Sequence, residues 1–200
     1  MSARVFQFKI TMKDIDPPIW RRILVPEKYS FWDLHVAIQD AMGWLDYHLH
    51  LFKIRYEREN DVDLIGIPDE DPFEGEPETL PGWEIPISDF FRELGKVAEY
   101  EYDFGDGWRH EVLFEGMLLK EKNKKYPKCI GGARACPPED CGGVGGYYRL
   151  LEIFADSSNE EYEEMVSWLG KKYDADDFDA GKVKFENPKK RWKIAFLEGQ

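Results

Sequence analysis

The sequence predicts an α+β fold built on an antiparallel or mixed sheet, and three patterns support this class. Two alternating apolar segments open the chain, a segment of helical periodicity follows them, and a second alternating pair forms one long hairpin pattern. Of the 200 residues, 42% are hydrophobic and 15% aromatic, which is enough to bury a core without disulfides or a metal. We therefore expect a single α+β domain over residues 1–200.

The first two strands are predicted at residues 4–12 and 19–25. Apolar and polar residues alternate in the first segment, as in a strand with one buried face. Pro17 and Pro18 then bend the chain, because each proline fixes φ and restricts the residue before it. Such a short connection favours an antiparallel pair.

A helix is predicted at residues 30–42. Ser30 is placed as its N-cap, Asp33 completes a variant of the capping box, and Gly43 is placed as the residue that ends it. A strand is then expected at residues 48–54. The resulting ββαβ order is compatible with a β-grasp-like arrangement.

The clearest hairpin joins residues 97–104 to residues 108–119 through Gly105-Asp106-Gly107, because Asp-Gly readily supplies the positive φ of a tight turn. Helical periodicity predicts three more helices, a short one before the hairpin and two near the C-terminus. Their ranges are 88–94, 147–154 and 160–171.

Two long stretches lack a periodic pattern and are expected to be loops. The first, at about residues 57–84, is rich in proline and strongly acidic. The second, at about residues 120–146, contains glycine, proline and all three cysteines, Cys129, Cys136 and Cys141. Their spacing differs from that of paired zinc ligands, so a structural loop is the first interpretation.

Charge and cysteine content limit the classes of function. There are 27 basic and 40 acidic residues, a net charge of −13, which disfavours direct binding to the DNA backbone. No apolar run approaches the roughly 20 residues that span a bilayer, so no membrane segment is expected. An odd number of cysteines and a start without a signal-peptide pattern favour a cytoplasmic protein.

Histidines provide the main candidate metal ligands. His48 and His50 are two residues apart, so on a strand both imidazoles would project from one face. Together with His110, and with Asp103 or Asp106 as a carboxylate, they would form a site for zinc or a similar divalent metal. The alternative is that all three histidines are hydrogen-bonded core residues, with no cofactor at all.

Basic residues interleaved with aromatic ones form two further clusters, one at Trp20-Arg21-Arg22 and one at residues 189–193. Either cluster can contact phosphates and stack on bases, or can simply form a charged rim over apolar surface. The complete set of candidate pocket residues is Trp20, Arg21, Arg22, Trp44, His48, His50, Asp103, Asp106, Trp108, His110, Glu139 and Asp140.

Several motifs occur together in one order along the chain, over roughly residues 4–187. They are Pro18-Ile19-Trp20-Arg21-Arg22-Ile23, Leu34-His35, Met42-Gly43-Trp44, His48-Leu49-His50-Leu51-Phe52, the segment from Tyr102 to His110, the segment from Cys136 to Gly143, and Gly146-Tyr147. In this order and spacing the chain resembles the plasmid pRiA4b ORF-3-like family, whose members are also described as passenger proteins of an insertion element. The resemblance implies a compact α+β domain and an association with mobile elements, but no established activity.

These observations leave three hypotheses. The first is a non-enzymatic binding protein, accessory to mobile-element or nucleic-acid transactions, that acts through a protein partner. The second is a metal-dependent hydrolase or nuclease-like enzyme that uses His48, His50 and His110. The third is a purely structural role for these motifs.

Overall fold

A computed structural model describes residues 3–56, 62–69 and 77–198. Its described strands form one sheet in the order β5-β4-β3-β6-β7-β1-β2-β8, and every neighbouring pair is antiparallel except the parallel pair β4–β5. The α+β class and the long hairpin are therefore confirmed. The strands are β1 (Arg4–Met12), β2 (Trp20–Pro26), β3 (His50–Arg55), β4 (Val62–Gly66), β5 (Thr79–Pro81), β6 (Val97–Tyr102), β7 (Trp108–Leu119) and β8 (Lys128–Ala133).

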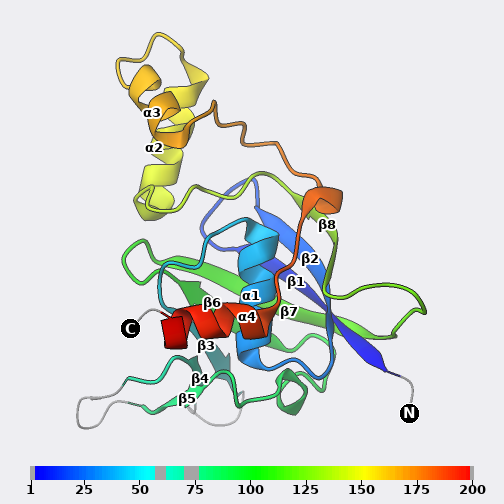
Figure 1. The fold of residues 1–200 in the computed structure, drawn as a ribbon. Coiled ribbons are helices and arrows are strands. Elements are labelled where there is room, and N and C mark those ends of the chain that lie inside the picture. The colour runs from blue at the N-terminus through cyan, green and yellow to red at the C-terminus, as the bar shows by residue number, and fades with distance from the viewer. Residues whose placement is uncertain (1–2, 57–61, 70–76, 199–200) are drawn as a thin grey trace.

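The helices divide into a central helix and a C-terminal set. Helix α1 lies against the sheet, α4 crosses in front of it, and α2 and α3 pack beside each other at one end of the molecule (Figure 1). No described helix combines the length and the apolar character needed to cross a membrane. The helices are α1 (Phe31–Met42), α2 (Gly143–Ala155), α3 (Tyr162–Leu169) and α4 (Pro188–Lys193), with short turns at Ile87–Asp89, Ala180–Lys182 and Ile194–Glu198.

The predicted ends of α1 are present in detail. The Ser30 hydroxyl accepts a hydrogen bond from the Asp33 backbone N–H at 3.2 Å, and the Asp33 carboxylate accepts one from the Ser30 N–H at 3.1 Å. At the other end, Gly43 has a φ of 92° and its N–H bonds to the Gln39 carbonyl. Because both ends depend on local chemistry, the sequence was sufficient to predict them.

The ββαβ part belongs to a larger mixed sheet whose strand order the sequence does not predict. The ββαβ order is correct, but β3 does not pair with β1 or β2, because the β6–β7 hairpin inserts between them. Strand β3 also begins at His50, so His48 lies in a bend outside the strand.

Both predicted loops contain strands. Strand β8 lies inside the expected loop at residues 120–146 and pairs with β2, while β4 and β5 lie inside the acidic stretch. Residues 57–61 and 70–76 of that stretch are outside the described residues. The helix expected at residues 88–94 is reduced to the single turn Ile87–Asp89. Strands β4, β5 and β8 are short and form by pairing with neighbouring strands, so the sequence carries little local pattern from which to predict them.

A polar network crosses the otherwise apolar core beneath α1. Gln39 donates a hydrogen bond to the Tyr100 hydroxyl at 2.9 Å, and that hydroxyl lies 2.9 Å from Nδ1 of His35. Nε2 of His35 is 2.8 Å from Asp46, and the His35 ring stacks on His50 with centroids 3.5 Å apart. Because a carboxylate only accepts, Nε2 of His35 carries the proton that faces Asp46, and Nδ1 of the neutral imidazole then accepts from the Tyr100 hydroxyl.

His110 gives the core a predictable pH dependence. It is fully buried, and burial lowers its pKa from 6.5 to about 4. Between these values the unfolded state binds a proton that the folded state does not, so stability falls as the pH falls from about 6.5 to about 4. Over this pH range, the free energy of unfolding of the His110→Phe variant should therefore fall by about 3 kcal/mol less than that of the native protein.

The measurement is the free energy of unfolding in urea at several pH values, for the variant and the native protein. At pH 8 the imidazole is neutral in both the folded and the unfolded protein, so any difference there reports packing and the loss of the bond between Nδ1 of His110 and the Tyr100 carbonyl. Equal slopes between pH 6.5 and 4 would contradict the proposed burial of neutral His110.

Candidate functional site

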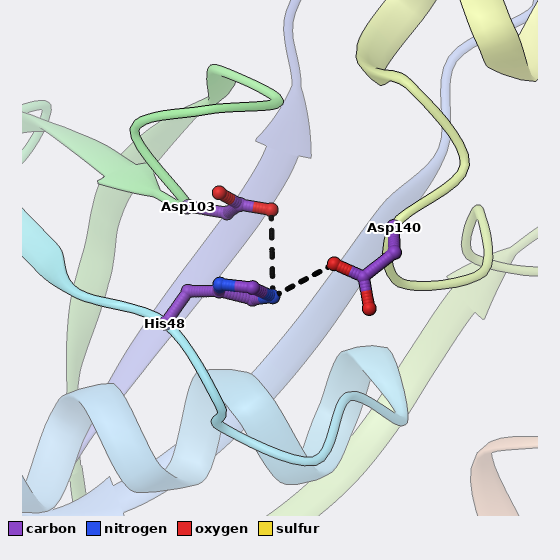
Figure 2. A group of neighbouring side chains, drawn as sticks. All are labelled: His48, Asp103 and Asp140. Atoms are coloured by element: carbon purple, nitrogen blue, oxygen red, sulfur yellow. Dashed lines mark ion pairs between the residues drawn. The ribbon is translucent and has the colours of Figure 1, made fainter.

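Three side chains from different parts of the chain meet at one end of the sheet. His48 lies between α1 and β3, Asp103 directly follows β6, and Asp140 belongs to the loop between β8 and α2 (Figure 2). Nε2 of His48 is 3.0 Å from an Asp140 carboxylate oxygen and 3.7 Å from one of Asp103. One ligand atom from each residue lies within 4.8 Å of the others, and no other such group of His, Cys, Asp or Glu occurs in the described part of the chain.

Asp103 is held by the turn that it begins. One carboxylate oxygen accepts hydrogen bonds from the backbone N–H groups of Gly105 and Asp106, at 3.0 and 3.3 Å. The Asp103 N–H in turn bonds to the Leu49 carbonyl at 2.9 Å. The first oxygen is thus fixed by the turn, and the second faces His48.

The loop carrying Asp140 is tied down on both sides. Trp44 Nε1 donates to the Pro137 carbonyl at 2.9 Å, and the Tyr102 hydroxyl donates to Glu139 at 2.5 Å. The Gly142 N–H donates to Asp106 at 3.2 Å. Trp44, Asp106 and Glu139 therefore hold the loop in position. They lie beside the three ligand-type residues but do not belong to that group.

Three of the six non-glycine residues with positive φ in the described chain lie in or beside this group. Asp46, Asp103 and Asp140 have φ values of 64°, 56° and 58°. Aspartate adopts this left-handed region more readily than most residues, yet it remains uncommon outside glycine. Such conformations gather at functional sites, where the surrounding contacts maintain them.

The group is partly open to solvent. The side chains of His48, Asp103 and Asp140 are 31%, 10% and 65% exposed. Nε2 of His48 is itself covered and has no hydrogen-bond partner among the described residues, although the Asp140 carboxylate is close enough for an ion pair and that of Asp103 lies 3.7 Å away. Eight other buried side-chain polar atoms of the described residues also lack a hydrogen-bond partner, so the feature that distinguishes Nε2 of His48 is its position beside two carboxylates.

The predicted three-histidine site is wrong in its membership. His50 is 3% exposed and stacks on His35, and His110 contacts Trp44 and Tyr100 within the core. Since β3 starts only at His50, strand alternation does not direct His48 and His50 to one site. Burial also lowers the pKa of His50 well below its usual value, with a further contribution from His35.

Other candidates lie elsewhere. Trp108 is buried beside Trp44, with ring centroids 6.1 Å apart. On β2, Arg22 forms an ion pair with Glu115 and lies over Trp20, whereas Arg21 projects to the opposite face and bonds to the Ala41 carbonyl. The Trp20-Arg21-Arg22 cluster is therefore divided between two faces of the sheet.

The three cysteines are free. Burial raises the pKa of Cys141 to about 12 and raises that of Cys136 further. Both thiols are therefore protonated at neutral pH, whereas a metal ligand or nucleophile requires the thiolate.

Comparison with known proteins identifies the family of this chain. The model of the plasmid pRiA4b ORF-3-like protein family matches residues 4–182. The chain belongs to this family. A relative, the uncharacterized protein y4hQ of Sinorhizobium fredii (strain NBRC 101917 / NGR234), is 32% identical over 186 residues, covering 92% of this chain and 89% of y4hQ.

A solved structure is also similar to this chain. It is the crystal structure of MM3350, a protein of unknown function from Methanosarcina mazei Go1, with 43% identity and a TM-score of 0.82. The alignment covers 92% of this chain and all of that chain. Neither relative carries a described activity that could be transferred.

Sequence patterns singled out all three ligand-type residues but not their grouping. Asp140 was associated with the glycine-rich loop, and no periodic signal connects that loop to His48. His35 and Asp46, which complete the buried network beside the site, were missed altogether. Their only sequence signal is a helical position facing the core for His35 and an aspartate three residues beyond Gly43 for Asp46.

Two adjacent glycines at the start of α2 test how the Asp140 loop is held. A Cβ at position 146 would overlap the Cys141 carbonyl, whereas a Cβ at position 145 would meet no atom within 4 Å. Gly146→Ala should therefore lower the midpoint of thermal unfolding and displace the loop. Gly145→Ala should be neutral or stabilise the protein by about 0.5–1 kcal/mol, because alanine favours a helix.

Thermal unfolding of the two variants, followed by circular dichroism, provides the measurement. Equal effects of the two substitutions would show that the close approach of Gly146 to Cys141 does not constrain the loop.

Proposed function

We propose that this protein is a non-enzymatic binding protein that holds a divalent cation at His48, Asp103 and Asp140 and presents that surface to a protein partner. The observation that carries the proposal is the position of the His48 Nε2 atom, 3.0 Å and 3.7 Å from two carboxylates and without a hydrogen bond.

The donor set suits zinc or manganese. An imidazole nitrogen and two carboxylate oxygens are ordinary ligands for either ion. With bonds of 2.0–2.2 Å, neighbouring ligand atoms around a tetrahedral zinc lie roughly 3.3 Å apart. The distances of 3.0 Å and 3.7 Å from His48 lie on either side of that value. A cation here would also neutralise two close carboxylates.

Exposed apolar side chains beside the group support a protein partner. Leu45, Tyr47 and Leu49 are 62%, 71% and 53% exposed, and Phe104 is 52% exposed. They are next to the site, because the Leu49 carbonyl accepts the Asp103 N–H and the Tyr47 N–H donates to the Tyr102 hydroxyl. Isolated exposed apolar residues are common, but several around a polar centre are typical of an interaction surface.

The charge of the protein indicates the chemistry of that partner. Asp103 directly precedes Phe104, Asp106 follows it by two residues, Glu139 and Asp140 lie in the loop bonded to Tyr102 and Asp106, and the whole chain carries −13. A partner with a basic surface is therefore favoured over bare DNA. We place this interaction in the cytoplasm, where three free cysteines are expected to stay reduced, and in the mobile-element or nucleic-acid processes with which the family is associated.

Cation binding predicts a specific loss in one variant. Asp140→Asn should weaken zinc and manganese affinity at least about tenfold, because the substitution removes a charged ligand. Titration calorimetry on the metal-stripped native protein and the variant measures this. Asp89→Asn, at a carboxylate that is 54% exposed and distant from the group in sequence, is the control and should keep native affinity.

Two results would contradict the proposal: absence of zinc and manganese binding by the native protein, or unchanged affinity in Asp140→Asn. His48→Ala is a second ligand variant and should show the same loss as Asp140→Asn. Circular dichroism of each variant confirms that the fold is retained.

A metal-dependent hydrolase is the second candidate, and the exposure of Asp140 favours it. Three protein ligands would leave a coordination position for water, as in catalytic zinc sites. This alternative predicts that zinc- or manganese-loaded protein cleaves bis(p-nitrophenyl) phosphate and that Asp140→Asn does not. If the protein only binds its partner and does not catalyse hydrolysis, the loaded native protein should release p-nitrophenol no faster than the Asp140→Asn control.

A further inference from the structure

We propose that a groove on the other side of the Asp140 loop binds a small apolar carboxylate, with Arg21 as its anchor. This site is separate from the His48 group and does not depend on the proposed cation. The groove lies between the end of α1, the segment at residues 135–139 and a strap formed by residues 169–184.

Arg21 is a buried cation with unused donors. Arg21 is only 1% exposed, yet it lines the groove. Its Nε and Nη1 atoms donate to the carbonyls of Ala41, Trp20 and Ala133, at 2.9–3.0 Å. Its Nη2 group, which carries two N–H donors, has no hydrogen-bond partner within residues 3–56, 62–69 and 77–198.

No carboxylate neutralises this guanidinium within the described chain. Arg21 forms no ion pair there, and burial lowers its pKa, offset only by the polar groups of Cys136, Cys129 and Tyr173. The Ala41 carbonyl belongs to the last turn of α1 and supplies a partial negative charge, which is less than a full counterion. Buried charges are normally paired, so this one is set up to receive an anion.

The strap stacks an aromatic ring on the same guanidinium. The Phe178 ring centroid lies 3.8 Å from Cζ of Arg21. Stacking on the face of the guanidinium leaves the Nη2 donors in its plane available, and a carboxylate oxygen can accept from them. The ring therefore orients Arg21 without occupying its hydrogen-bonding positions.

The groove has the size and lining of a small-molecule site. Its volume is about 800 Å³, within the 300–1,000 Å³ range usual for such sites. Apolar side chains make up much of the wall, with Arg21 as a buried polar group among them. These apolar residues are Met42, Trp44, Leu45, Pro137, Pro138, Leu169, Tyr173, Phe178 and Val183.

The charged side chains at the rim nearly balance one another, so the preference for an anion rests on Arg21. Lys171, Lys172, Lys182 and Lys184 line the groove and form no ion pair with any described residue. The lining also contains the carboxylates of Asp40, Glu139, Asp174, Asp177 and Asp179, of which Asp40 is paired with Arg191. The four lysines are exposed-rim cations that can add to the attraction of Arg21 for an anion, but they do not create it.

Together, an apolar wall and a buried guanidinium specify an organic acid more closely than an inorganic anion. A carboxylate on an aromatic or aliphatic body would bond to Nη2 of Arg21 while its body covers Trp44 and Phe178. Phosphate would satisfy Arg21 but would leave the apolar wall uncovered.

The test uses the full-length protein with benzoate, its neutral isostere benzamide, and inorganic phosphate, each titrated by ligand-observed NMR. Benzoate should bind about tenfold or more tightly than benzamide, because a charged hydrogen bond contributes about 1.5–3 kcal/mol. Equal binding of the two, binding of neither, or binding of phosphate in preference to benzoate would overturn the proposal.

Variants assign the binding to this groove. Arg21→Gln should abolish the preference for benzoate over benzamide. Because Arg21 is buried and its loss can unfold the protein, Lys182→Gln/Lys184→Gln provides a second test at exposed positions and should weaken benzoate binding several-fold. Lys122→Gln/Lys125→Gln removes the same charge from the β7–β8 connection and should have no effect. If both lysine pairs weaken binding equally, the groove is not the site.

Discussion

The insertion of one hairpin into the middle of the sheet determines the rest of this structure. Strands β6 and β7 separate β3 from β1, so the hairpin pairs with both halves of the sheet. Its turn begins at Asp103, whose carboxylate accepts two backbone N–H groups and whose own N–H bonds to Leu49. The same residue therefore shapes the turn, attaches it to the segment before β3 and contributes an oxygen to the His48 group. A carboxylate that both shapes the turn with one oxygen and faces His48 with the other is difficult to replace by any other side chain.

Rigidity around the His48 group comes from polar contacts between segments that have no regular secondary structure. The α1–β3 connection, the β6–β7 turn and the loop before α2 are joined by bonds from Trp44, Tyr102 and Gly142. Each bond is directional, so together they define positions more narrowly than apolar packing would. This arrangement suits a site whose ligand-type atoms must stay within a few tenths of an ångström of their required places.

The parts of the fold that could be predicted from sequence are those determined locally. Ser30, Asp33 and Gly43 define both ends of α1 through contacts within a few residues, and the Asp-Gly turn defines the long hairpin. Strand β8 was missed because its glycine-rich sequence becomes a strand only through pairing with β2. His48 was assigned to a strand that starts two residues later, and that small error joined it to His50 in place of Asp140. The grouping of His48 with Asp103 and Asp140 depends on three connections meeting in space, which periodicity along one chain does not encode.

Helix α4 connects a late segment of the chain to its first helix. Arg191 forms an ion pair with Asp40 at 2.8 Å and lies 3.7 Å from Asp46, the aspartate that bonds to His35. Trp32 on α1 also donates to the Pro188 carbonyl. During synthesis on the ribosome, residues 188–193 are translated after every described strand. A nascent chain that already contains all of the described strands therefore still lacks the counter-charge for Asp40 and Asp46, and its α1 is not yet covered by α4.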